Sequence, residues 1–112
     1  MTKFKRVFVS NANFRFGTAH LLTLADQIVY LCDSPIFDDM LEDSDAIDRF
    51  ETSVMDKLRD FDPHTDVLAF YGDVLLLCMA LWEIAQMELD YPVSVARWSA
   101  KAERYLVKQL EV

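Results

Sequence analysis

The chain has 112 residues, of which 53% are hydrophobic and 12% aromatic, and its formal net charge is −8 at pH 7. This composition predicts one globular domain with its own hydrophobic core, and the scarcity of Gly, Pro and Cys argues against a low-complexity or disulfide-rich chain. An acidic chain repels phosphate groups, so direct binding to nucleic acid or to an anionic membrane surface is not expected. The absence of a Cys-x-x-Cys pair and of an apolar leader favours a cytoplasmic location.

The first elements expected along the chain are two short strands on either side of a short helix. Residues 6–11 (RVFVSN) form a β-branched and aromatic run that ends in turn residues, which is typical of a strand. Residues 16–26 are expected to form the helix, and residues 27–35 a second strand that ends at Pro35. Residues 36–43 are expected to be mainly a loop.

Residues 44–61 show the clearest helical pattern. Ser44 and Asp45 are expected to supply the N-cap and an acidic group that complements the helix dipole, and Pro63 is expected to end the helix. The apolar residues recur at spacings that place them on one side of a helix, namely Ile47, Phe50, Val54, Leu58 and Phe61. The opposite side must then face water, and it carries Asp48, Glu51, Asp56 and Asp60.

Residues 66–89 contain most of the strongest apolar residues. Residues 66–72 (DVLAFYG) predict a strand covered on both faces, and residues 73–89 predict a core helix with Asp73 as its N-cap. Charged residues interrupt the run, so no uncharged stretch of membrane-spanning length remains. Side chains expected in the core of this unit are Leu68, Phe70, Leu76 and Leu81. Elsewhere, core positions rather than ligand sites are expected for Cys32, Cys78, Trp82, Met40, Met55, Met79 and Met87.

Residues 92–112 predict two strands joined near residues 99–103. The apolar residues that alternate with polar ones there are typical of a hairpin with one solvated face, and they are Val93, Val95, Leu106 and Leu110. The expected order of elements is therefore β-α-β-α-β-α-β-β. That order predicts a small three-layer, Rossmann-like α/β domain over residues 1–112, whose mostly parallel sheet ends in a C-terminal antiparallel hairpin.

The carboxyl ends of the expected strands carry small polar or acidic residues. Because ligands bind beyond these ends in open α/β sheets, one hypothesis is a small, nucleotide-like ligand held by Asn11, Asn13, Asp33, Ser34, Gly72 and Asp73. The favoured alternative is that these residues serve turns and helix caps. The chain contains no GxGxxG turn or GK[ST] phosphate loop, and it lacks the acidic pair of a phospho-receiver domain.

The sequence shows no recognisable catalytic constellation. No nucleophile–base pair can be assembled, and no second histidine lies near His64 to suggest a metal site. His64 is expected in the turn between a helix and a strand, and His20 on the short helix. These observations predict a protein that is not an enzyme and that requires neither a metal nor another cofactor.

The most distinctive feature is an acidic block in the middle of the chain. Residues 38–66 carry eleven acids and three bases, a net charge of −8. One interpretation is a solvated helix face, but several of the acids precede the helix. The hypothesis we favour is that a basic protein surface, of a host or a virus, binds Asp38, Asp39, Glu42, Asp43, Asp48, Glu51 and Asp56. The sequence leaves the oligomeric state open, and a homodimer is compatible with it.

The chain also resembles small uncharacterised open reading frames of single-stranded DNA bacteriophages. The pieces that carry the resemblance are RVFVSN, IVYLCDSPIF, DRFETSVMDKLRDFDPHTDVLAFYG and RYLVKQLEV, which together span most of the chain. One departure is the hairpin turn, where residues 99–102 replace a common Asn-Gly pair. The resemblance implies a phage or mobile-element origin and an accessory role, and it assigns no site.

Overall fold

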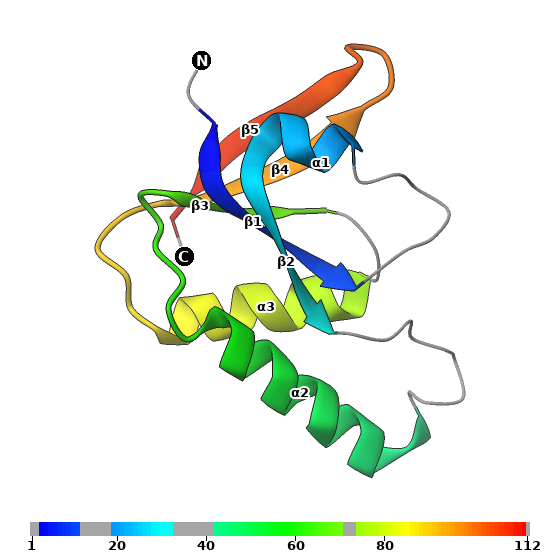
Figure 1. Cartoon of the computed structure of the whole chain (residues 1–112). Helices are drawn as coiled ribbons and strands as arrows, with labels where there is room; N and C mark the ends of the chain where they lie inside the picture. Colours follow the sequence, from blue (N-terminus) through cyan, green and yellow to red (C-terminus); the bar gives the residue numbers. More distant parts are fainter. Residues whose placement is uncertain (1–2, 12–18, 33–41, 71–73, 112) are drawn as a thin grey trace.

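The structure is a computed structural model that describes residues 3–11, 19–32, 42–70 and 74–111 (Figure 1). Within these ranges, three helices and five strands follow one another in the order β1 (Phe4–Asn11), α1 (Ala19–Leu24), β2 (Ala25–Cys32), α2 (Ser44–Leu58), β3 (Asp66–Ala69), α3 (Val74–Gln86), β4 (Val93–Ser99) and β5 (Arg104–Leu110). This is the predicted order. The boundaries differ by a few residues, and both α1 and β3 are shorter than expected.

The described strands form one sheet in the order β2-β1-β3-β4-β5. β1 runs parallel to β2 and β3, β3 runs parallel to β4, and β5 returns antiparallel to β4. In the centre of the sheet, Phe8 is in register with Val29 on one side and with Leu68 on the other. The predicted fold class, a mostly parallel α/β sheet with a C-terminal antiparallel hairpin, is therefore confirmed.

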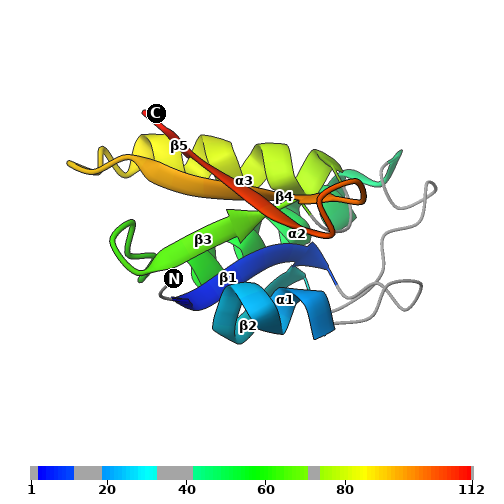
Figure 2. The same cartoon turned by 90° about the horizontal axis from the view of Figure 1, so that it is seen from above.

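Helices cover both faces of this sheet. α1 lies on one face, and α2 and α3 lie together on the other (Figures 1 and 2). The chain passes from β1 to β2 in one direction and then crosses back over β1 to reach β3. Right-handed crossovers that run in opposite directions place their helices on opposite faces, which accounts for the three layers.

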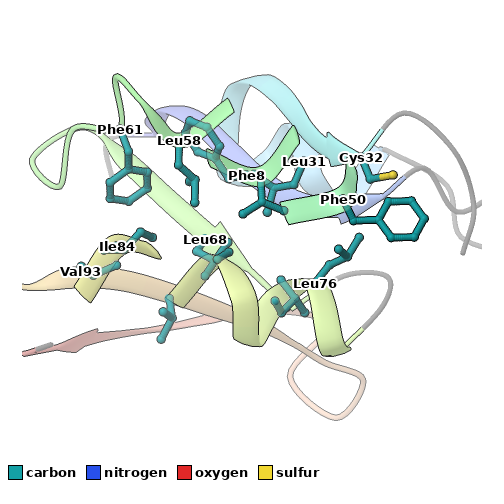
Figure 3. Close-up of a cluster of buried hydrophobic side chains, with 14 of the residues drawn as sticks. Phe8, Leu31, Cys32, Phe50, Leu58, Phe61, Leu68, Leu76, Ile84 and Val93 are labelled. Carbon is teal, nitrogen blue, oxygen red and sulfur yellow. The ribbon is translucent and has the colours of Figure 1, made fainter. Parts of the chain in front are cut away.

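The larger part of the core lies between the sheet and the pair α2 and α3 (Figure 3). Alternation along β1 sends Phe8 into this part, whereas Val7 and Val9 face the smaller cluster beneath α1. The rings of Phe8 and Phe61 meet edge to face, with their centroids 5.3 Å apart. The helices contribute most of the remaining large side chains of this part, which include Val54 and, as Figure 3 shows, Phe50, Leu58, Leu76 and Ile84.

Of the side chains expected to be buried in the 66–89 unit, Leu68 and Leu76 are buried, and Leu81 is partly buried. Phe70 was predicted wrongly, because its side chain is 44% exposed. β3 ends at Ala69, one residue earlier, and Phe70 instead borders a shallow hollow beside β5. The end of a short strand therefore brings an apolar side chain to the surface.

The two strands of the hairpin differ more than their sequences suggest. In β4, the residues from Val93 to Ala96 are all buried, because β4 lies between β3 and β5 and its residues contribute to both parts of the core. β5 is one of the two edge strands of the sheet and is exposed over most of its length, including Leu106. The expectation of one solvated face was therefore wrong for the start of β4.

A buried ion pair holds the turn between α2 and β3. The carboxylate of Asp66 accepts hydrogen bonds from Arg6 Nη2 at 2.6 Å, from Arg6 Nε at 3.2 Å and from the Asp62 N–H at 2.8 Å. Arg6 also contacts Asp60 at 3.1 Å. The hydrogen bond to Asp66 is the main reason why the pKa of Arg6 is raised. His64 lies in this turn as predicted, and its N–H donates to the Asp62 carboxylate at 2.9 Å.

Candidate interaction surface

The carboxyl ends of the parallel strands lie along one end of the sheet, where the sequence predicts a site for a small ligand. β1, β2 and β3 end at Asn11, Cys32 and Ala69 at this end, and Asn11 is in register with Cys32. The direction of the connections reverses here, between β1 and β3, as it does at the ligand sites of open α/β sheets. The backbone of Asn11 closes β1. The other predicted residues lie outside the described residues, and they are Asn13, Asp33, Ser34, Gly72 and Asp73.

α2 and the two residues before it present most of the described acids of this block to solvent. The predicted residues that the structure describes there are all exposed, namely Glu42, Asp43, Asp48, Glu51 and Asp56. Asp38 and Asp39 lie outside the described residues. The apolar side of α2 faces the sheet, with Phe50, Val54 and Leu58 buried, so the helical period turns the carboxylates outward as predicted. Residues 42–60 carry seven acids against three bases, which makes this surface strongly negative.

The acidic side chains on α2 are not equivalent. The N-cap is Asp43 and not Ser44 as predicted, because the Asp43 carboxylate accepts hydrogen bonds from the N–H groups of Asp45 at 2.9 Å and Ala46 at 3.4 Å. Asp56 forms an ion pair with Arg59 at 2.8 Å. Among the ion pairs of the described residues, none involves Asp48 or Glu51. The negative charge of these two carboxylates is therefore not offset by an ion pair with a described base.

Beside this acidic surface, α3 exposes an apolar one that the sequence did not predict. Leu77, Ala80 and Ile84 on the inner side of α3 are buried. On the outer side, Val74 is 71% and Trp82 is 66% exposed. Neighbouring residues on that side are Leu75, which is partly exposed, and Cys78, whose thiol is free and exposed.

The expected burial of Cys78 and Trp82 was wrong because α3 is apolar on almost every side. Its sequence contains two apolar stripes, one that includes Leu77 and Ile84 and one that includes Leu75, Cys78 and Trp82. The sheet and α2 together cover only part of the helix surface. Both stripes can be recognised in the sequence, and their presence indicates that one of them is exposed to solvent. Local periodicity does not show which of the two is buried.

Together, α2 and α3 form a groove, which we name the α2–α3 groove. It consists of two adjoining hollows of about 410 and 420 Å³, and Glu83 lines both of them. The residues that α2 and its C-cap contribute are Ile47, Glu51, Thr52, Met55, Asp56, Leu58 and Arg59. The residues contributed by α3 and the position after it are Leu75, Cys78, Met79, Trp82, Glu83 and Met87. The lining is therefore mainly apolar, with carboxylates contributed from both helices.

No protein-family model, curated protein or solved structure matches this chain. In the part of the chain that the structure describes, no group of three His, Cys, Asp or Glu side chains is arranged to hold a metal ion. No helix of that part has the length and apolar character needed to cross a bilayer. The candidate surface therefore rests on its own geometry, exposure and charge.

Proposed function

We propose that the protein is a small acidic interaction protein, without catalytic activity of its own, which binds a basic protein surface through the exposed side of α2. The observation that carries the proposal is the position of Asp48 and Glu51, which are exposed and belong to no ion pair of the described residues. Repulsion between neighbouring carboxylates destabilises the folded chain, and Lys or Arg side chains of a partner would offset that repulsion.

This function suits an accessory protein of a phage or mobile element that acts in the cytoplasm of its host. The basic partner would be a protein of the host or of the same replicon. Such an encounter is steered by charge, so association should be fast and binding should weaken as salt screens the surface.

Charge reversal on α2 tests this proposal. The protein and the double variant Asp48→Lys/Glu51→Lys serve as baits in a lysate of the host bacterium at low and at high salt. We expect a defined partner that binds the unaltered chain at low salt, dissociates at high salt, and fails to bind the double variant. Asp26→Lys is the matched control, because Asp26 is also exposed but belongs to β2 and not to the helix that carries the acidic side, and its reversal should leave binding unchanged.

Binding of the same purified partner to the double variant, or binding that ignores ionic strength, would show that the acidic side of α2 is only a solvated helix face. Isothermal titration calorimetry with the purified partner measures the Kd for the unaltered protein and for the double variant. Circular dichroism of the variant separates loss of binding from loss of folding.

A second candidate function is the binding of a small nucleotide-like ligand at the carboxyl ends of the strands. The observation that favours it is the reversal of the chain connections between β1 and β3 at the edge where both strands end. A ligand that binds the native state raises the melting temperature, so a thermal-shift screen of nucleotides tests this candidate. The absence of any shift at millimolar nucleotide would exclude it.

A further inference from the structure

We infer that the α2–α3 groove is the docking site for an amphipathic helix with a basic polar side, contributed by the partner. This inference rests on the proposed function and adds the shape of the binding element. A basic surface alone would need only the carboxylates of α2. The groove adds an apolar surface that the same partner element would cover.

The first argument is the arrangement of the exposed apolar side chains. Isolated hydrophobic side chains are common on protein surfaces, whereas contiguous ones mark binding sites. Leu75 and Trp82 line the groove from α3, and Met55, which is 50% exposed, lines it from α2. Trp is the residue type most enriched at the energetic centres of interfaces, and flexible Met side chains adapt to varied apolar partners. Met79 and Met87 belong to the same lining.

The second argument is the length and shape of the groove. Its α2 side extends from Ile47 to Arg59, and its α3 side from Leu75 to Met87. At 1.5 Å per residue, each side is about 18 Å long, which corresponds to roughly three turns of a helix. An apolar groove between two helices suits the ridges of a third helix, and amphipathic helices are recognised in this way by several kinds of protein.

The third argument is the charge around the apolar lining. Glu51 and Asp56 contribute carboxylates from α2, and Glu83 contributes one from α3. The base in the described lining, Arg59, is already paired with Asp56. Lys and Arg bury their aliphatic stems against apolar surface while their charged ends reach outward, so a basic amphipathic helix satisfies both the lining and its acidic border.

Two other occupants are disfavoured, the first by the same charges and the second by the sheet edges. A second copy of this chain would bring acidic helices against an acidic groove, because residues 42–60 carry seven acids and three bases. An extended segment would be expected to pair with an edge strand of the sheet, β2 or β5, rather than to lie between two helices. Of these strands, β5 carries Arg104 and Lys108, and charged side chains of this kind protect sheet edges from pairing.

Matched synthetic peptides test the inference with the intact protein. The probes are a Leu/Lys peptide of about five helical turns with an amphipathic pattern, the same composition scrambled to remove the pattern, and a Leu/Glu peptide with the original pattern. Fluorescence anisotropy of labelled peptides measures affinity. We expect the patterned Leu/Lys peptide to bind about tenfold or more tightly than the scrambled one, and the Leu/Glu peptide not to bind.

Two properties of the groove localise the binding. The Cys78 thiol is exposed whereas Cys32 is buried, so protection of Cys78 from alkylation reports occupancy. Leu75→Ser and Trp82→Ser should each lower the affinity for the patterned Leu/Lys peptide about tenfold. Leu22→Ser is the matched control, because Leu22 is 44% exposed against 43% for Leu75 and lies on α1, at the opposite face of the sheet. That control should bind like the unaltered chain.

The outcomes separate this inference from the proposed function. If both groove variants bind the patterned peptide normally while Asp48→Lys/Glu51→Lys does not, the acidic side of α2 binds basic partners without the groove, and the inference is overturned. Equal affinity for the patterned and the scrambled peptides would also overturn the inference. If neither basic peptide binds, the inference also fails, and the host pull-down decides separately whether the acidic surface has a partner.

Discussion

The helices α2 and α3 lie on the same face of the sheet, but their sequences define their orientation to different degrees. α2 carries its apolar residues on one side, and that side is buried, while its acids are exposed. α3 is apolar on both its inner and its outer side, and Val74 and Trp82 are among the most exposed large side chains of the described structure. An amphipathic helix has one way to satisfy burial, whereas a uniformly apolar helix has several.

The comparison teaches that excess apolar character in a helix can indicate binding rather than burial. α3 contributes the buried side chains Leu76, Leu77, Ala80 and Ile84 to the core, and Met79 and Leu81 pack against it partly buried. The outer side of α3 is apolar too, although Val74, Leu75 and Trp82 are exposed there. Because α2 supplies acids next to this surface, the two helices together form an apolar groove with an acidic border, which neither helix forms alone.

The largest expected effect concerns the connections that follow the two helices. The turn after α2 depends on Asp66, which is fully buried and paired with Arg6, whereas the segment after α3 contains the exposed Asp90. Asp66→Asn should destabilise the protein by roughly 3–5 kcal/mol, because it leaves the Arg6 guanidinium without its buried partner. Asp90→Asn is the control, and should stay within about 0.5 kcal/mol. Urea unfolding measures both. A small effect of Asp66→Asn would show that Asp60 alone holds Arg6.

The direction of the Arg6 pKa shift determines how the contribution of Arg6 to stability depends on pH. The pKa of Arg6 is raised in the folded protein, mainly by its hydrogen bond to Asp66. The stability contributed by a group with a raised pKa is present below its unfolded value, and it is lost only as the pH rises through the higher folded value. The Arg6 contribution should therefore stay constant from neutral to moderately alkaline pH in urea titrations.

The next effect tests whether the inner sides of α2 and α3 are equivalent. Leu58 of α2 and Ile84 of α3 are almost fully buried in the same part of the core. Leu58→Ala and Ile84→Ala should each cost about 2–5 kcal/mol of unfolding free energy, because each leaves a cavity between the helices and the sheet. Chemical denaturation of the two variants measures this. If Ile84→Ala were close to neutral, the assignment of the inner side of α3 would be wrong.

The smallest effect concerns the outer sides, where the helices differ in chemistry but not in their contribution to stability. Asp48→Ser on α2 and Trp82→Ser on α3 should each change the unfolding free energy by no more than about 0.5 kcal/mol, because both side chains are exposed. Thermal and urea unfolding test this directly. A cost for Trp82→Ser as large as that for Ile84→Ala would place Trp82 in the core and remove the α2–α3 groove as a surface.

Most of the fold was predictable because its signals are local. The stripe that contains Phe50, Val54 and Leu58 defines both the existence and the orientation of α2, and the alternation of strand and helix patterns implies a mostly parallel sheet. The exposure of the acidic side of α2 was predictable from the same stripe. The exposure of Phe70 was not predictable, since the two residues that follow the observed end of β3 at Ala69 continue the apolar run.

The sequence by itself determined the order of the elements, the orientation of α2 and the acidity of the surface, since each depends on spacing or composition within a short window. Only the tertiary structure decided which side of α3 is buried, because two equally apolar stripes compete for the same core. It also decided the pairing of Arg6 with Asp66, which are 60 positions apart. The α2–α3 groove belongs to this second group, because its lining exists only when two separate helices pack side by side on the sheet.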